Sequence, residues 1–121
     1  YLTEERAKEL EIEKVDLDDA FARADYLTVH MPMTAQTKGI VDEAAFAKMK
    51  DGALLVNVAR GAIVDTEALI TELKSGRITA ALDVTDPEPL PSDHPPTRLL
   101  PMLRYPALDY STPPEEGLGS R

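Results

Sequence analysis

The chain has 121 residues, 43% of them hydrophobic, which suits one small domain or a piece of a larger one. A formal net charge of −9 disfavours binding to nucleic acids and anionic membranes, because both favour basic surfaces. The absence of cysteine excludes disulfides and thiolate metal sites, and no apolar run approaches the roughly 18 residues that span a bilayer. We therefore expect a cytoplasmic protein that binds neither nucleic acid nor membrane and has no metal site.

The amino-terminal part of the chain predicts two helices and two strands. Residues 3–10 are typical of the end of a polar helix, and residues 13–15 predict a short edge strand. A short helix over 17–24 follows, and then "DYLTVHM", at 25–31, predicts a buried strand because it is apolar and rich in β-branched residues.

The middle of the chain continues this alternation, with polar residues that begin its helices and glycines that end them. The expected elements are a helix over 42–48, a strand over 53–58, a helix that Asp65 or Thr66 begins and Gly76 ends, and a strand over 78–84. Strands without polar alternation, separated by amphipathic helices, indicate an α/β fold whose parallel sheet is covered on both faces.

The composition changes after residue 84. Nine of the ten prolines lie between Pro87 and Pro114, so this tail is expected to be extended loop with one strand near 103–105.

Ligands bind at the carboxyl ends of the strands in such sheets. Three loops leave those ends here: residues 30–32, residues 58–60, and residues 83–88. A guanidinium at Arg60 can hold a small carboxylate with two parallel hydrogen bonds, which would explain a charge directly after a buried strand. The alternative is structural, with Arg60 paired to Asp83 or Asp65 to close the edge of the sheet.

Four long motifs occur in a fixed order: "VHMPMTAQTKGIVD" (29–42), "MKDGALLVNVARGAIVD" (49–65), "ALITELKSGRITAALDV" (68–84) and "DPEPLP" (86–91). Together they resemble the nucleotide-binding domain of the NAD(P)-dependent D-2-hydroxyacid dehydrogenases, and "LDVTDPEPLPSDHP" (82–95) looks most like the glyoxylate/hydroxypyruvate reductase branch. The resemblance covers residues 1–112 as a partial NAD(P)-binding domain and leaves 113–121 as a tail. It implies the second half of a Rossmann-type doubly wound parallel sheet with a proline-rich carboxyl-terminal tail.

The resemblance also implies roles for individual residues. Arg60 would hold the carboxylate and keto group of a small 2-keto acid such as glyoxylate or hydroxypyruvate. Val58 and Ala59 would line the nicotinamide of NAD or NADP, and Asp83 would bond its carboxamide. Glu88 would pair with a catalytic histidine and raise the pKa of that ring, so that it protonates the carbonyl oxygen.

The loop from His30 to Thr34 is implied to pass the adenosine ribose and diphosphate, with Met31 and Pro32 closest. Taken without the resemblance, His30 is expected to be a buried loop histidine and Glu88 an exposed acid in a turn. His94 is expected to be a solvated loop residue.

Two departures from the family's pattern limit what this chain is expected to do alone. No glycine-rich phosphate loop follows a strand, and the family's histidine position is occupied by Ala107, which cannot donate a proton. We therefore expect a fragment that is inactive in isolation. The alternatives are a catalytically dead half-domain that serves as a binding or oligomerisation module, and a parent protein that is competent apart from Ala107. A half-sheet also leaves a strand edge open, so association with a second copy or another chain is expected.

Overall fold

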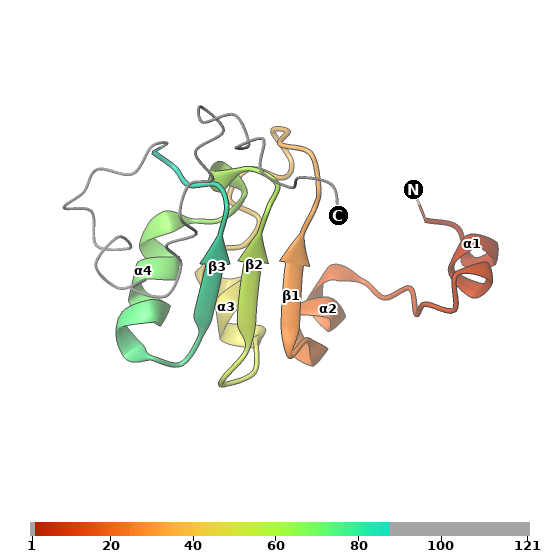
Figure 1. Cartoon of the computed structure of the whole chain (residues 1–121), viewed down its shortest axis with the longest axis horizontal. Coiled ribbons are helices and arrows are strands. Elements are labelled where there is room, and N and C mark those ends of the chain that lie inside the picture. The colour runs from red at the N-terminus through yellow and green to blue at the C-terminus, as the bar shows by residue number, and fades with distance from the viewer. Residues whose placement is uncertain (1, 88–121) are drawn as a thin grey trace, which may run out of the picture.

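A computed structural model describes residues 2–87 and contains a three-stranded parallel sheet (Figure 1). The strands β1 (Tyr26–Val29), β2 (Leu54–Asn57) and β3 (Thr79–Leu82) lie in the order β1-β2-β3. Val29 of β1 and Leu82 of β3 both lie opposite Asn57 of β2. The predicted parallel α/β arrangement is confirmed, and the three strands end at the same edge of the sheet.

The α-helices begin where the sequence places capping residues. They are α1 (Glu4–Glu9), α2 (Leu17–Arg23), α3 (Glu43–Lys48) and α4 (Thr66–Ser75), with a 3-10 helix η1 (Gly61–Ile63) between β2 and α4. The side chains of Thr3, Asp16, Asp42 and Asp65 each accept a hydrogen bond from the backbone N–H three residues later. Gly76 ends α4 in the left-handed conformation, with a φ of 72°, as expected for a helix-ending glycine.

The helices cover one face of the sheet within residues 2–87, whereas the sequence predicted cover on both. α3 and α4 connect neighbouring strands in the same direction, and right-handed crossovers of this kind place both helices on the same face. Leu55, Val29 and Ala80 are buried on that face. On the opposite face Tyr26 is 76% exposed, so the packed core lies between β1–β3 and the helices α2, α3 and α4.

The predicted edge strand at 13–15 is wrong. These residues have no strand conformation and belong to the connection between α1 and α2, which runs apart from the sheet (Figure 1). A strand needs a hydrogen-bonded neighbour, and in the described structure this segment has none. Glu13 instead pairs with Arg23, and their hydrogen bond lowers the pKa of Glu13 and raises the pKa of Arg23.

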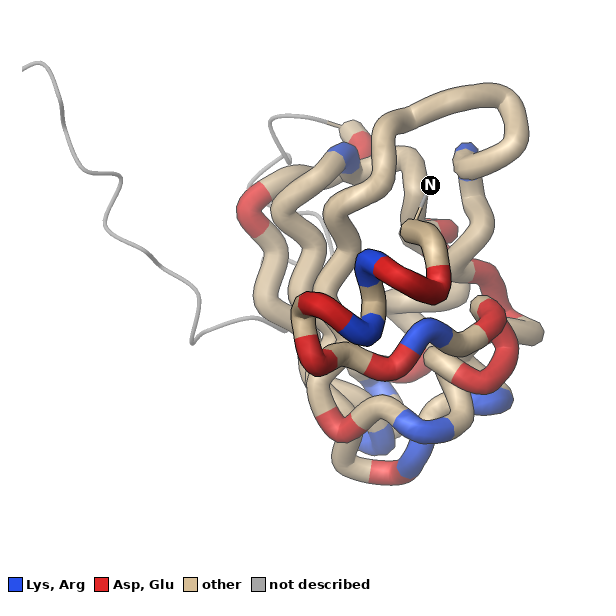
Figure 2. The backbone as a smooth tube through the Cα atoms, turned by 90° about the vertical axis from the view of Figure 1, so that its right-hand side faces the viewer, with Lys and Arg blue, Asp and Glu red and all other residues tan. Residues whose placement is uncertain are grey.

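Acidic and basic residues are intermixed on the side of the molecule that carries α1 (Figure 2). The exposed ion pairs on this side include Arg6–Glu9, Lys14–Glu4 and Arg23–Glu13. Such exposed pairs contribute little to stability, because water screens both charges. No helix within residues 2–87 is long and apolar enough to cross a membrane.

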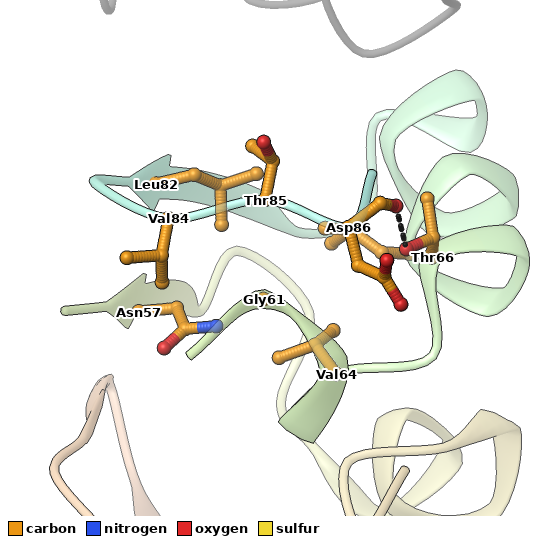
Figure 3. Close-up of a pocket in the computed structure, with 9 residues that line it drawn as sticks. Asn57, Gly61, Val64, Thr66, Leu82, Val84, Thr85 and Asp86 are labelled. Atoms are coloured by element: carbon orange, nitrogen blue, oxygen red, sulfur yellow. Dashed lines mark hydrogen bonds between the residues drawn. The ribbon is translucent and has the colours of Figure 1, made fainter. Parts of the chain in front are cut away.

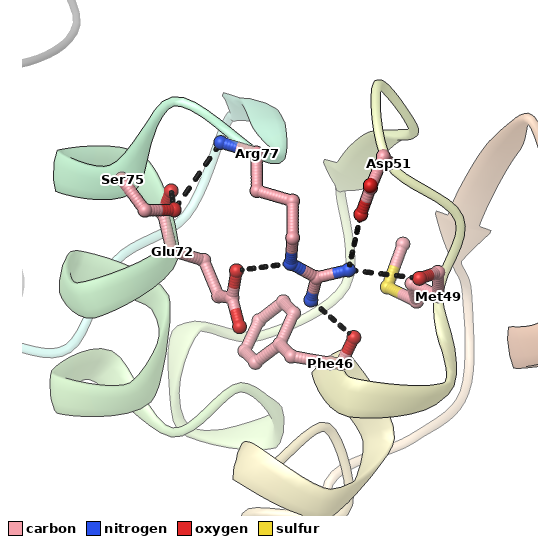
Figure 4. A network of polar contacts seen from close by, with 6 residues as sticks. All are labelled: Phe46, Met49, Asp51, Glu72, Ser75 and Arg77. Atoms are coloured by element: carbon pink, nitrogen blue, oxygen red, sulfur yellow. Dashed lines mark hydrogen bonds and ion pairs between the residues drawn. The ribbon is translucent and has the colours of Figure 1, made fainter.

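Arg77 connects elements at the amino-terminal ends of β2 and β3 (Figure 4). Its guanidinium donates to the backbone carbonyls of Phe46 and Met49, at the end of α3, and to the carboxylates of Glu72 and Asp51. The hydrogen bond with Glu72 is the main reason that the pKa of Arg77 is raised. The last carbonyls of a helix have few partners within the helix, and here the Phe46 carbonyl accepts from the N–H of Met49 at 3.0 Å. Arg77 adds a second donor to that carbonyl, supplies one to the Met49 carbonyl, and ties α3 to α4.

We predict that Arg77→Ala lowers the free energy of unfolding by about 2 kcal/mol, because charge-assisted hydrogen bonds to α3 and Glu72 are lost. Arg77→Lys keeps the charge but not the fork of donors, so it is expected to be intermediate. Urea unfolding measures both. The control is Arg6→Ala, which removes an exposed pair and is expected to change stability by less than about 0.5 kcal/mol. Equal effects at Arg77 and Arg6 would contradict this role.

Candidate functional site

A cleft of about 500 Å³ opens at the carboxyl ends of β1 and β2. One wall is the loop over 30–33, which follows β1, and the other is the loop over 58–60, which follows β2. The residues that line it are His30, Met31, Pro32, Met33, Val58, Ala59 and Arg60. It therefore lies where parallel sheets bind ligands.

The cleft combines apolar side chains with the imidazole of His30 and the guanidinium of Arg60. Met33 and Val58 are 45% and 44% exposed, although both side chains are apolar. Ala59 is buried, and Arg60 is exposed. Exposed apolar side chains beside a guanidinium suit a ligand that has an apolar part and an anionic group.

Arg60 makes no ion pair within residues 2–87. Its Nη1 donates to the carbonyl of Ala59 at 2.7 Å, which uses one of its five N–H donors. The structural alternative, a pair with Asp65 or Asp83, does not form in the described structure. The Asp65 carboxylate instead caps α4 by accepting from the backbone N–H of Ala68 at 3.0 Å.

The turn that presents Arg60 depends on Asn57, which the sequence interpretation missed. The Asn57 side chain is at the end of β2 and the residue is 1% exposed. Its Oδ1 accepts from the N–H of Ala59 at 3.1 Å, and its Nδ2 donates to the carbonyl of Arg60 at 2.9 Å. The available signal was an amide inside the otherwise apolar run "ALLVNV".

The loop after β3 packs closely against the start of η1 (Figure 3). A Cβ atom at Gly61 would lie 2.1 Å from the carbonyl carbon of Thr85, so only glycine fits there without displacement. Thr66 Oγ1 donates to the carbonyl of Asp86 at 3.0 Å, and the N–H of Asp83 donates to the carbonyl of Asn57 at 3.0 Å. These contacts surround a small pocket of about 20 Å³ and hold the third loop beside the Arg60 loop.

Five of the expected site residues lie together in the cleft: Met31, Pro32, Val58, Ala59 and Arg60. Asp83 follows β3 and is exposed, but it is not among the described residues that line the cleft. His30 lines the cleft and is exposed, so the expected burial of this histidine is wrong. Glu88, His94 and Ala107 lie outside the described residues.

No cluster of histidine, aspartate or glutamate side chains within residues 2–87 is arranged to hold a metal ion. The permanent positive charge in the cleft belongs to the Arg60 side chain.

Comparison with known proteins identifies relatives of this chain. The family model described as D-isomer specific 2-hydroxyacid dehydrogenase, NAD binding domain, matches residues 1–106. D-3-phosphoglycerate dehydrogenase of Archaeoglobus fulgidus is 41% identical over 113 residues, which are 93% of this chain and 21% of that protein. Glyoxylate reductase of Thermofilum pendens is 47% identical over 88 residues, which are 72% of this chain and 26% of that protein.

A solved structure supports the same relationship. Apo D-mandelate dehydrogenase of Rhodotorula graminis aligns with a TM-score of 0.70 and 41% identity, over 77% of this chain and 28% of that one. The chain therefore spans between about a fifth and just over a quarter of the length of these relatives.

We predict that Gly61→Ala separates the loop after β3 from η1 and destabilises the protein by about 3 kcal/mol, because the added methyl overlaps backbone atoms that cannot rotate away. In ¹H–¹⁵N NMR spectra the amide signals of residues 83–86 should shift.

The control is Gly76→Ala. It also removes a glycine, but the space around that position is open and its cost comes from the positive φ alone. Signals at 83–86 that stay unchanged in Gly61→Ala would refute the close packing.

Proposed function

This chain belongs to the D-isomer specific 2-hydroxyacid dehydrogenase family, as its NAD-binding domain, and on this premise we propose that the cleft binds a nicotinamide cofactor, NAD or NADP, beside a small 2-keto or 2-hydroxy acid. The observation that carries the proposal is the position of one exposed guanidinium next to an apolar wall at the carboxyl ends of β1 and β2. In the complete reaction the bound cofactor supplies or accepts the hydride.

The cleft fits the nicotinamide portion of such a cofactor. Val58 and Ala59 offer apolar and backbone atoms to a flat ring. Met31 and Pro32, on the facing wall, are proposed to lie closest to the adenosine ribose and diphosphate. Asp83 is proposed to reach the carboxamide from the end of β3. The fit covers one end of the cofactor, because residues 2–87 contain no glycine-rich loop to hold its diphosphate.

Arg60 is proposed to bind the carboxylate of the substrate. Its guanidinium is always charged and presents paired N–H donors that match the two oxygens of a carboxylate. The same group next to the keto oxygen stabilises the negative charge that develops there during reduction. Glyoxylate and hydroxypyruvate are the proposed substrate class, supported by the similarity to glyoxylate reductase and to a hydroxypyruvate reductase that is 46% identical over 86 residues.

The chain is also proposed to be inactive in hydride transfer when isolated. In the family resemblance Glu88 supports a histidine that donates the proton, and Ala107 stands at that position and carries no acid. Loss of a positioned general acid slows such a step about 10²- to 10⁴-fold.

A second candidate function, a binding or oligomerisation module, is favoured by the edge of β1. This strand pairs with β2 on one side, and within residues 2–87 no strand covers its other side. An uncovered edge presents backbone donors and acceptors that another strand can use.

We predict that Arg60→Ala weakens binding of oxamate, a stable analogue of 2-keto acids, by about 10- to 100-fold, because charge-assisted hydrogen bonds are lost. NADH binding should change little, since the apolar wall remains. Isothermal titration measures both ligands, and NADH oxidation with glyoxylate or hydroxypyruvate is followed in parallel.

Arg6→Ala, which removes a cation on α1, controls for net charge. Unchanged oxamate binding in Arg60→Ala would refute the role of Arg60. Turnover by the wild-type chain that Arg60→Ala abolishes would instead show that a proton donor comes from elsewhere, and would refute the proposed inactivity.

We also predict that the chain associates with a second copy through β1, giving twice the mass of one chain in light scattering. Tyr26→Lys, at an exposed position of the edge strand, should return the chain to a monomer because charged edges resist pairing. A wild-type monomer across the accessible concentration range would refute the association.

A further inference from the structure

We infer that Asn57 is a positioning residue for the proposed carboxylate site: its buried carboxamide sets the path of the main chain at residues 59 and 60 and thereby directs the Arg60 guanidinium into the cleft. The inference rests on the proposed function of Arg60.

Burial is the first observation. Asn57 is the one polar residue among the buried residues of the described part of the chain, and it is 1% exposed. Burying an amide without partners is costly, so an asparagine in a core is retained only where its hydrogen bonds are satisfied. Its neighbour in β2, Leu55, is fully buried, so a purely packing role at position 57 would be met by an apolar side chain.

The amide uses both of its functional groups on the same turn. Oδ1 accepts from the N–H of Ala59 and Nδ2 donates to the carbonyl of Arg60, at 3.1 and 2.9 Å. The side chain therefore supplies one partner to each of these backbone groups where β2 ends, and the Arg60 carbonyl also accepts from the N–H of Ile63 at 3.3 Å. Aspartate lacks the donor and leucine lacks both groups, so aspartate would remove the side-chain bond to the Arg60 carbonyl and leucine would remove both bonds to the turn.

The contacts of Arg60 explain why its backbone matters. Its side chain is exposed and has no ion pair within residues 2–87, so packing does not fix its direction. Its described anchor is the carbonyl of Ala59, which accepts from Nη1 at 2.7 Å. Asn57 holds the N–H of Ala59 and the carbonyl of Arg60, so it fixes the main chain on both sides of that anchor.

The hydrogen bonds of Asn57 hold the backbone of this turn in its conformation before a ligand binds. The backbone of Arg60 is extended, with φ −145° and ψ 143°, and its side chain makes no capping hydrogen bond to η1. The guanidinium thus remains available to a ligand while the backbone beneath it is held. Preparation of this kind reduces the ordering cost of binding.

The test compares Asn57→Asp with the wild-type chain in three measurements. Urea unfolding gives stability, heteronuclear ¹H–¹⁵N NOE values at residues 58–61 report the order of the turn, and titration with oxamate is followed at the Arg60 Nε–H signal. We expect lower NOE values at Ala59 and Arg60 and about tenfold weaker binding of oxamate, because one hydrogen bond to the turn is lost.

Ile78→Val is the matched control for stability. Ile78 is 1% exposed and directly precedes β3, at the end of the sheet opposite the cleft, so its truncation destabilises the core without contact to Asn57. The NOE values and the oxamate affinity of this variant should equal those of the wild-type chain. If Asn57 contributed only to stability, the NOE values and the oxamate affinity would fall in both variants in step with their loss of stability.

The outcomes separate the two proposals. Wild-type NOE values and affinity in Asn57→Asp would overturn the inference while leaving Arg60 as the binding group. If the wild-type chain shows no saturable shift with oxamate, the proposed function fails, and the NOE comparison still decides whether Asn57 orders the turn. If Asn57→Asp does not fold, Asn57→Ser is measured in its place, since its hydroxyl can accept from Ala59 but is too short to reach the carbonyl of Arg60 as well.

Discussion

The central strand β2 is the element on which the rest of the structure depends. It is hydrogen-bonded to β1 on one side and to β3 on the other, and its residues Leu55 and Asn57 are buried beneath the helices. Because Val29 and Leu82 both lie opposite Asn57, the loops that follow the three strands begin side by side. A shift of one residue in either pairing would turn the core face of a strand outward and separate those loops, so the register that buries the core also assembles the cleft.

The two ends of the sheet are built in different ways. At the amino-terminal end the polar groups are joined to one another: Arg77 connects the last carbonyls of α3 to Glu72 of α4. At the carboxyl-terminal end the backbone itself comes close, with Gly61 against Thr85, and polar side chains such as Arg60 face outward. The amino-terminal end of the sheet therefore ties the helices together. At the carboxyl-terminal end, closely packed main chain lies beneath an exposed surface. This division is general in parallel sheets, where binding sites lie at the carboxyl ends of strands.

Local signals in the sequence predicted the elements that depend on local chemistry. The helix between Asp65 and Gly76 was predicted with both ends correct, because an N-terminal cap and a left-handed glycine are properties of a few adjacent residues. The strand at 13–15 was predicted wrongly, since a strand exists only with a partner that the sequence does not specify. The close approach of Gly61 to Thr85 and the hydrogen bonds of Asn57 likewise depend on where distant or turning segments meet. The convergence of Met31, Val58 and Arg60 followed from topology alone, because parallel strands place their following loops at one edge. The roles of those residues came from the family resemblance and stay predictions.

Arg60 and Arg77 differ in how many of their donors the described part of the protein uses. Both residues lie beside strands of the same sheet, and both carry a permanent charge. The side chain of Arg77 is 26% exposed and makes four hydrogen bonds, to two carbonyls and two carboxylates, which leaves one of its five N–H donors for a ligand. Arg60 is exposed and, within the described residues, uses one donor in a hydrogen bond to the carbonyl of Ala59. A structural arginine would be expected to resemble Arg77, since unpaired donors beside a core gain nothing for stability. The difference in hydrogen bonding, more than the charge itself, distinguishes the residue that holds the fold from the residue that faces the cleft.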